Sequence, residues 1–282
     1  MNLKPLCLFF AILFIVSGCH KTAQTPTSYD LTSEERIWME KFFKDIMLDQ
    51  SAIYTLCGSK PMTTINIHYH SDEEVLAWFN QLSEEKKKNA IVIEDYDLPQ
   101  NWEKWEKIRL HFPISRYLFF KRTNPEDPKF ASLYFVDVAK VALTLQENYA
   151  IFNRETGFKF NPFEVVIAME KWSEFWDKVF GNSTLVGLLY GFGLKNSSSF
   201  TWKYADHPED CDRFCQSLKS YFSDKPTFGK LTVSQLHLPI FASFSDGKDE
   251  VIEKYKKEQE AIRREYQGKD FLNYTLQKLT SN

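Results

Sequence analysis

The one long apolar run in this chain lies at its N-terminus, and its position constrains what the rest of the chain can fold into. Residues 6–16 are continuously apolar, preceded by a short stretch carrying Lys4 and followed by two small residues and Cys19. A positive stretch, an apolar stretch and small residues, in this order, are typical of a secretory signal. The run is shorter than the roughly 20 residues that a membrane-spanning helix needs. We therefore predict removal of this segment and a globular body formed by the remaining chain.

The end of the signal, Val16-Ser17-Gly18-Cys19, resembles the lipobox of bacterial lipoproteins, with valine in place of the commoner leucine. The resemblance implies cleavage before Cys19, a diacylglycerol group on its sulfur and an acyl chain on the new amino terminus. Several acyl chains anchor a soluble domain stably on a membrane. The alternative is an ordinary cleaved signal with a chance cysteine. His20 stands where a retention signal of the enterobacterial type would place Asp, which favours the outer membrane over the inner membrane of the cell envelope.

The rest of the chain has the composition of a globular protein. Hydrophobic residues make up 43% and charged residues 26% of the sequence. The net charge of -3 gives no general attraction to nucleic acid, so no nucleic-acid partner is predicted. The predicted organisation is a signal peptide over residues 1–18, a lipidated cysteine with a polar tether over 19–30, and one domain over 31–282.

Helical patterns dominate this domain, and a few alternating segments indicate a small antiparallel sheet. The fold class expected is therefore a helix-dominated single α+β domain. The predicted helices cover residues 32–50, 71–88, 102–108, 137–152, 161–181, 206–222, 249–267 and 270–279. The predicted strands cover residues 64–69, 91–93, 117–121 and 132–136, with a turn over 54–62 and an extended run over 231–244.

The clearest helix start is Asn161-Pro162-Phe163-Glu164, which has a capping side chain, proline at the first helical position and glutamate at the third. Apolar residues then recur at steps of three and four up to Phe180, and Gly181 ends the run. We expect this helix to be central and buried. A Trp172→Asp change would then unfold the domain by burying an unpaired charge.

Four glycines fall between Gly181 and Gly193 and are followed by Lys195. They match neither the dinucleotide-binding fingerprint nor the nucleotide P-loop. Close helix packing and a left-handed turn are the favoured interpretation, and a ligand-binding loop is the alternative.

Two segments, residues 54–61 (YTLCGSKP) and residues 187–196 (GLLYGFGLKN), resemble recurrent segments of uncharacterised, often lipid-anchored proteins from chlamydia-like intracellular bacteria. That family has no established activity. The resemblance therefore implies an envelope context and no particular chemistry.

His68 and His70 are two residues apart on a predicted strand, so both imidazoles share one face and could bind one metal ion. Asp72 or Glu94 could supply a third ligand. Two ligands do not make a metal site, and surface histidines beside a turn are the simpler explanation. No metal or other cofactor is predicted.

His207, Cys211 and Cys215 are spaced by four residues on a predicted helix, with Asp210 close by, and form the second metal or redox candidate. The spacing lacks the Cys-x-x-Cys pattern of structural zinc sites. Pairing of Cys57 with Cys211 or Cys215, or simple burial of the thiols, is preferred over a strained disulfide within one helical turn.

Glu94-Asp95-Tyr96-Asp97 could provide paired carboxylates for glycoside hydrolysis or calcium binding, although a solvated strand end is the default. On the predicted helix over 249–267, a narrow apolar seam could dock on a partner or on the body of the protein. The residues of this seam are Ile252, Tyr255, Ile262 and Tyr266.

Together these patterns predict a lipid-anchored cell-envelope protein that binds or supports another envelope component, such as a protein or peptidoglycan, and that is not an enzyme. The alternative is an envelope hydrolase or metal-dependent enzyme that uses His68 and His70, or His207, Cys211 and Cys215.

Overall fold

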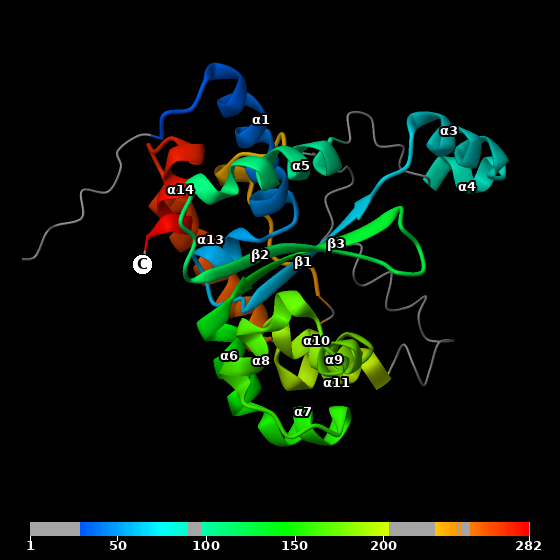
Figure 1. Ribbon diagram of the computed structural model, residues 1–282, viewed down its shortest axis with the longest axis vertical. Coiled ribbons are helices and arrows are strands. Elements are labelled where there is room, and N and C mark those ends of the chain that lie inside the picture. The colour runs from blue at the N-terminus through cyan, green and yellow to red at the C-terminus, as the bar shows by residue number, and fades with distance from the viewer. Residues whose placement is uncertain (1–28, 90–96, 203–228, 242, 244–248, 282) are drawn as a thin grey trace, which may run out of the picture.

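A computed structural model describes residues 29–89, 97–202, 229–241, 243 and 249–281 of the chain (Figure 1). These residues form a helix-dominated α+β domain around one small antiparallel sheet, as the sequence predicts. The predicted strand over 91–93 and the predicted helix over 206–222 lie outside the described residues.

The sheet has three strands in the order β1-β3-β2. They are β1 (Met62–His68), β2 (Tyr117–Thr123) and β3 (Phe130–Asp137). Both pairings are antiparallel, and β3 is the central strand. The alternating patterns therefore located these strands correctly, to within two residues at each end.

Helices cover both faces of the sheet (Figure 1). On one face lie α1 (Ser33–Lys44), α5 (Leu98–Ile108), α13 (Glu250–Tyr266) and α14 (Phe271–Thr280). On the other face lie α6 (Val138–Glu147), α8 (Pro162–Ile167), α9 (Glu174–Phe180) and α10 (Ser183–Leu189). Beyond this second layer lies α7 (Tyr149–Thr156), while α11 (Gly193–Thr201) packs against α10.

Alternate residues of each strand point into the two different cores. Leu133 and Phe135 of β3 join the core beneath α1 and α5, whereas Tyr134 and Val136 join the core beneath α6 and α10. Because side chains alternate across a strand, a sheet buried on both faces needs apolar residues at nearly every position.

Phe42 occupies the centre of the first core. Its ring centroid lies 5.3–6.4 Å from those of neighbouring aromatic side chains, which come from α1, α5 and β2. These neighbours are Trp38, Phe43, Trp102, Trp105 and Phe119. Much of the chain's aromatic content thus fills this core, where large rings bury the most apolar area.

The first predicted helix is confirmed, with one change at its end. Thr32 and Glu35 form the capping box, and the helix continues beyond Lys44 as a π-helical turn over Asp45–Asp49. The segment predicted as a turn begins instead with a short helix, α2 (Ile53–Leu56).

The single long helix predicted over 161–181 is wrong, although Asn161 and Pro162 do begin a helix as expected. α8 ends at Ile167, a 3-10 turn follows, and Trp172 has a positive φ of 46° before α9 begins at Glu174. The indole of Trp172 is half-buried, donates to Asp177 at 2.7 Å and stacks beneath Arg122. These contacts hold the kink in place, so an aspartate at position 172 would not enter a core.

The helix predicted over 71–88 is also divided, into α3 (Asp72–Gln81) and α4 (Glu84–Asn89). These two helices project beyond the end of β1 and do not lie on the sheet (Figure 1). Leu76, expected to point inward, is 59% exposed. The apolar spacing is compatible with a helix, but spacing alone cannot show whether a partner surface lies opposite.

The predicted helix over 137–152 likewise divides at Asn148, between α6 and α7. Instead of a continuous extended run, residues 231–241 contain a 3-10 turn over Val233–Gln235.

α13 and α14 agree with the prediction. In α13, Tyr255, Ile262 and Tyr266 are buried against the body of the domain, so the apolar seam docks there. Among the described helices, none is both long and apolar enough to cross a membrane.

We expect Phe42→Ala to lower the free energy of unfolding by about 3–5 kcal/mol, because it removes a fully buried ring and leaves a cavity. Ile37→Ala, on the same helix but at a side chain 73% exposed, is the matched control and should change stability by less than about 0.5 kcal/mol. Urea unfolding of both variants measures the difference. Equal losses would show that Phe42 is not at the centre of a core.

Candidate functional site

A cavity of about 490 Å³ lies beside the N-terminal half of β1, where the segment after the π-helical turn meets α10 and α11. We call it the Lys60 cavity. Its polar lining includes Ser51, Lys60, Thr63, Thr64, Asn196 and Ser197. Its apolar lining includes Phe180, Val186, Tyr190, Phe192, Phe200, Ile240 and Phe241. An apolar wall with a few converging polar groups is the usual composition of a small-molecule site.

Glycines allow the elements around this cavity to approach closely. Gly191 has a φ of +77°, and a Cβ atom there would lie 3.0 Å from Cδ of Pro61 and 2.6 Å from Oη of Tyr255. At Gly187 a Cβ atom would lie 2.4 Å from Oγ of Ser197, so this glycine lets α10 pack against α11. The glycine-rich segment thus provides close packing and a left-handed turn, as predicted, and it also lines the cavity.

The segments over residues 54–61 and 187–196 meet at this cavity. Lys60 and Pro61 belong to the first, while Gly187, Tyr190 and Asn196 belong to the second.

Lys60 is the most unusual group in the cavity. Its side chain is 6% exposed, yet within the described part of the chain it forms neither an ion pair nor a side-chain hydrogen bond. Nζ lies over the Tyr190 ring, 5.6 Å from its centroid. Burial lowers the pKa of Lys60 from 10.5 to about 7. Near neutral pH the amine of Lys60 is therefore only partly protonated. Its charged form has no counter-ion among the described residues.

Asp137 and Asp249 are buried charges that are compensated, whereas Oδ1 of Asp45 is buried without a hydrogen-bond partner and burial raises the pKa of Asp45 to about 7. The carboxylate of Asp137, which is fully buried, accepts hydrogen bonds from Arg116 and contacts Nζ of Lys140 at 3.0 Å. Asp249 caps α13 and accepts from Ser243 and Asn196. Lys60 differs from Asp137 and Asp249 because the described residues of its cavity include no such partner.

Two further polar atoms in the cavity lining are buried without a hydrogen-bond partner, Oγ1 of Thr64 and Oδ1 of Asn196. The amide group of Asn196 donates to the carbonyl of Phe192 at 3.2 Å and to Asp249 at 3.1 Å. These two bonds fix the orientation of the side chain and leave Oδ1 as a free acceptor. A buried polar atom without a partner costs free energy unless water or a ligand binds it.

Ser51 adds backbone strain to the same cavity. It has a φ of 59°, one of two positive values at non-glycine residues among the described ones, and follows directly after the π-helical turn. Such strain and π-helical turns both occur often at functional sites. Nearby, burial raises the pKa of Tyr190 to about 12, so its phenol stays protonated at neutral pH.

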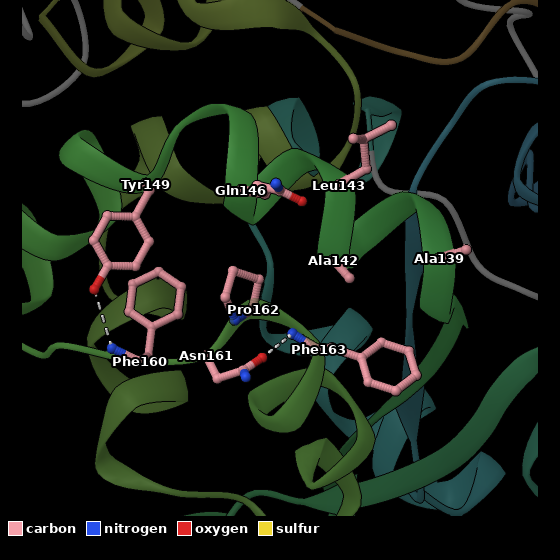
Figure 2. Close-up of a pocket in the computed structure, with 9 residues that line it drawn as sticks. All are labelled: Ala139, Ala142, Leu143, Gln146, Tyr149, Phe160, Asn161, Pro162 and Phe163. Carbon is pink, nitrogen blue, oxygen red and sulfur yellow. Dashed lines mark hydrogen bonds between the residues drawn. The ribbon is translucent and has the colours of Figure 1, made fainter. Parts of the chain in front are cut away.

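A second and larger hollow, of about 850 Å³, is an open apolar groove between α6 and the residues that begin α8 (Figure 2). Figure 2 shows Ala142 and Leu143 on one side and Pro162 and Phe163 on the other. Oδ1 of Asn161 already accepts from the Phe163 amide, and among the described residues no charged side chain lines the groove. The groove therefore lacks the unsatisfied polar groups of the Lys60 cavity.

His68 and His70 lie at the opposite end of β1 from the cavity. Their rings stack with centroids 6.1 Å apart, and Nδ1 of His70 lies 3.8 Å from Glu74. Burial, followed by the neighbouring His70, lowers the pKa of His68. The side chains of the two expected third ligands, Asp72 and Glu94, are outside the described part. Among the side chains that are described, no three His, Cys, Asp or Glu residues could hold a metal ion.

The remaining predicted groups have different positions. His207, Asp210, Cys211 and Cys215, and also Glu94 and Asp95, lie outside the described residues. Asp97 precedes α5 and pairs with Lys41 at 2.8 Å.

Cys57 is a free thiol beside Oη of Tyr266, which corresponds to the buried-thiol alternative and not to a disulfide. Burial, and then the charge of Glu265, raises the pKa of Cys57 to about 11, so this thiol is a poor nucleophile at neutral pH.

Sequence reasoning did not identify Lys60, because a lysine before proline in a turn is normally solvent-exposed. The one local signal was its position, between Gly58 and the strand that begins at Met62.

Comparison of the chain with protein-family models, with curated proteins and with solved structures found no match.

We expect Lys60→Met to stabilise the ligand-free protein by roughly 1–3 kcal/mol at about pH 6, because methionine fills similar space without a buried charge. The direction in which stability changes with pH follows from the protons bound by the folded and unfolded chains. Between about pH 7 and 10.5 the unfolded chain retains the lysine proton that the folded chain has released. The wild-type stability should therefore rise over that range relative to the variant, and the gain from methionine should shrink.

Urea unfolding at several pH values between about 6 and 9 tests this prediction. Lys60→Arg is the control, because arginine stays charged throughout and should destabilise the fold without the same pH dependence. A constant difference between wild type and Lys60→Met would show that the amine keeps its proton.

Proposed function

We propose that this chain is a lipid-anchored protein of the cell envelope whose domain binds a small organic molecule in the Lys60 cavity. Two independent observations support the proposal. The first is the N-terminal signal that ends in Val16-Ser17-Gly18-Cys19. The second, which carries the binding function, is a buried and uncompensated amine inside a cavity large enough for a small ligand.

The ligand-binding part follows from the energetics of the cavity. Oδ1 of Asn196 is buried without a protein partner, the buried side chain of Lys60 has no ion pair in the described structure, and both line the same space as the buried hydroxyl of Thr64. Each such atom destabilises the empty protein, and a ligand that binds them recovers that free energy. The aromatic side chains on the other side of the cavity offer apolar contact area.

The anchoring part predicts the mass of the mature protein. Protein purified from membranes should have the mass of residues 19–282 plus attached acyl chains, because the lipobox-like motif places cleavage before Cys19. A Cys19→Ser variant should keep its signal or leave the membrane fraction. Intact-mass spectrometry of both proteins gives the answer. A wild-type chain that begins at another residue and carries no lipid would refute the anchor.

The binding part predicts that wild-type protein, purified from its own membranes and examined by native mass spectrometry, carries a small non-covalent ligand. Ser183→Trp should remove this ligand, because Ser183 is an exposed residue at the cavity wall and a tryptophan there would occupy the space. Leu143→Trp, which fills the groove of Figure 2 instead, is the matched control and should retain it. Loss of the ligand only in Leu143→Trp would move the binding site to the groove.

A further inference from the structure

Among the described residues the cavity provides no counter-ion for Lys60, and this indicates the charge of its ligand. Asp49 also lines the cavity, but its carboxylate accepts from the amide of Gly229 at 2.6 Å and forms no ion pair with Lys60. No other carboxylate lines the cavity among the described residues. A ligand with an anionic group would therefore supply the partner that the protein does not.

The number of positive charges limits the type of anion. Lys60 is the only cationic side chain in the described lining, and no arginine is present to form two parallel bonds. A phosphate group carries up to two negative charges and is usually bound by several donors or by arginine. With one lysine, and with Asp49 nearby, the cavity suits a group of a single negative charge, which is a carboxylate.

The orientation of Asn196 indicates a second feature of the ligand. Both hydrogen atoms of its amide are engaged by Phe192 and Asp249, so the side chain offers only an acceptor, Oδ1, to the cavity. A ligand group that meets this atom must donate a hydrogen bond, as a hydroxyl or an amino group does. The buried hydroxyl of Thr64, which lies beside the phenol of Tyr190, can donate or accept.

One wall of the cavity is apolar, although Gln50, Ser51, Thr63, Ser183 and Ser197 add further polar groups to the lining. Phe192 and Phe241 stack with ring centroids 4.9 Å apart, and Phe180 and Val186 extend this wall. An apolar or aromatic portion of the ligand would bury its surface there.

From these features we infer that the ligand of the Lys60 cavity is a small monocarboxylic acid that also carries a hydroxyl or amino group and an apolar side group. The carboxylate pairs with Nζ of Lys60, the donor group binds Oδ1 of Asn196, and the apolar portion lies against the phenylalanine wall. This inference rests on the proposed function, since it specifies the chemistry of the ligand in the same cavity.

A set of four related probes tests the inference by isothermal titration calorimetry on the full mature chain at about pH 6, where Lys60 is protonated. The probes are 3-phenyllactate, its neutral amide, 3-phenylpropionate, which lacks the hydroxyl, and phenyl phosphate. We expect 3-phenyllactate to bind at least about tenfold more tightly than each of the others, the difference expected for one lost charge or hydrogen bond. Binding of 3-phenyllactate should be lost in Lys60→Met and should take up protons near pH 8, because the carboxylate favours the charged amine.

Several outcomes would overturn the inference, and they separate it from the proposed function. Equal binding of the amide would exclude recognition of a carboxylate, and tighter binding of phenyl phosphate would assign a phosphate ligand. In both cases the cavity would remain a binding site. If no probe binds the wild-type protein, the inference falls. If native protein also carries no ligand that Ser183→Trp removes, the proposed function falls with it.

Discussion

Burial of β3 on both faces is the constraint on which the rest of the structure depends. Residues that alternate along this strand, such as Phe135 and Val136, enter different cores. The flanking strands β1 and β2 pair with β3 on its two sides, which satisfies its backbone and leaves only its side chains to be covered. A three-stranded sheet cannot bury two faces alone, so the helices must form a layer on each.

The need to cover both faces of β3 also brings α1 together with α13 and α14. α13 and α14 complete the core that α1 begins, and Oη of Tyr255 donates to the carbonyls of Tyr190 and Gly191 in the other layer. Tyr255 therefore links α13 to the turn after α10. Since Gly191 also contacts Pro61, this link positions the wall of the Lys60 cavity relative to β1. The cavity is thus a product of tertiary packing and not of one local motif.

This dependence explains which parts could be predicted from the sequence. The capping box at Thr32, the strands over 117–121 and 132–136 and the long C-terminal helix are local patterns, and the structure confirms them. The kink at Trp172 depends on Arg122 and Asp177, and the exposure of Leu76 depends on the direction in which the chain leaves β1. Neither cause appears in the spacing of apolar residues. The Lys60 cavity was missed for the same reason, because its lining comes from segments far apart in the sequence.

The unfavourable groups of the domain are also informative as a set. Lys60, which has no counter-ion among the described residues, Ser51 with its positive φ, and the buried polar atoms of Thr64 and Asn196 come from separate segments, yet they line one cavity. Other unfavourable groups, the buried polar atoms of Asp45, Trp102 and Trp105, lie outside it. Elsewhere a buried charge such as Asp137 is fully compensated, so the fold is able to pair its charges. An apolar residue in place of Lys60 would remove the free-energy cost of the buried amine without loss of packing. Groups that lower the stability of the empty protein are expected at a ligand-binding site, because contacts with the bound ligand offset this loss of stability.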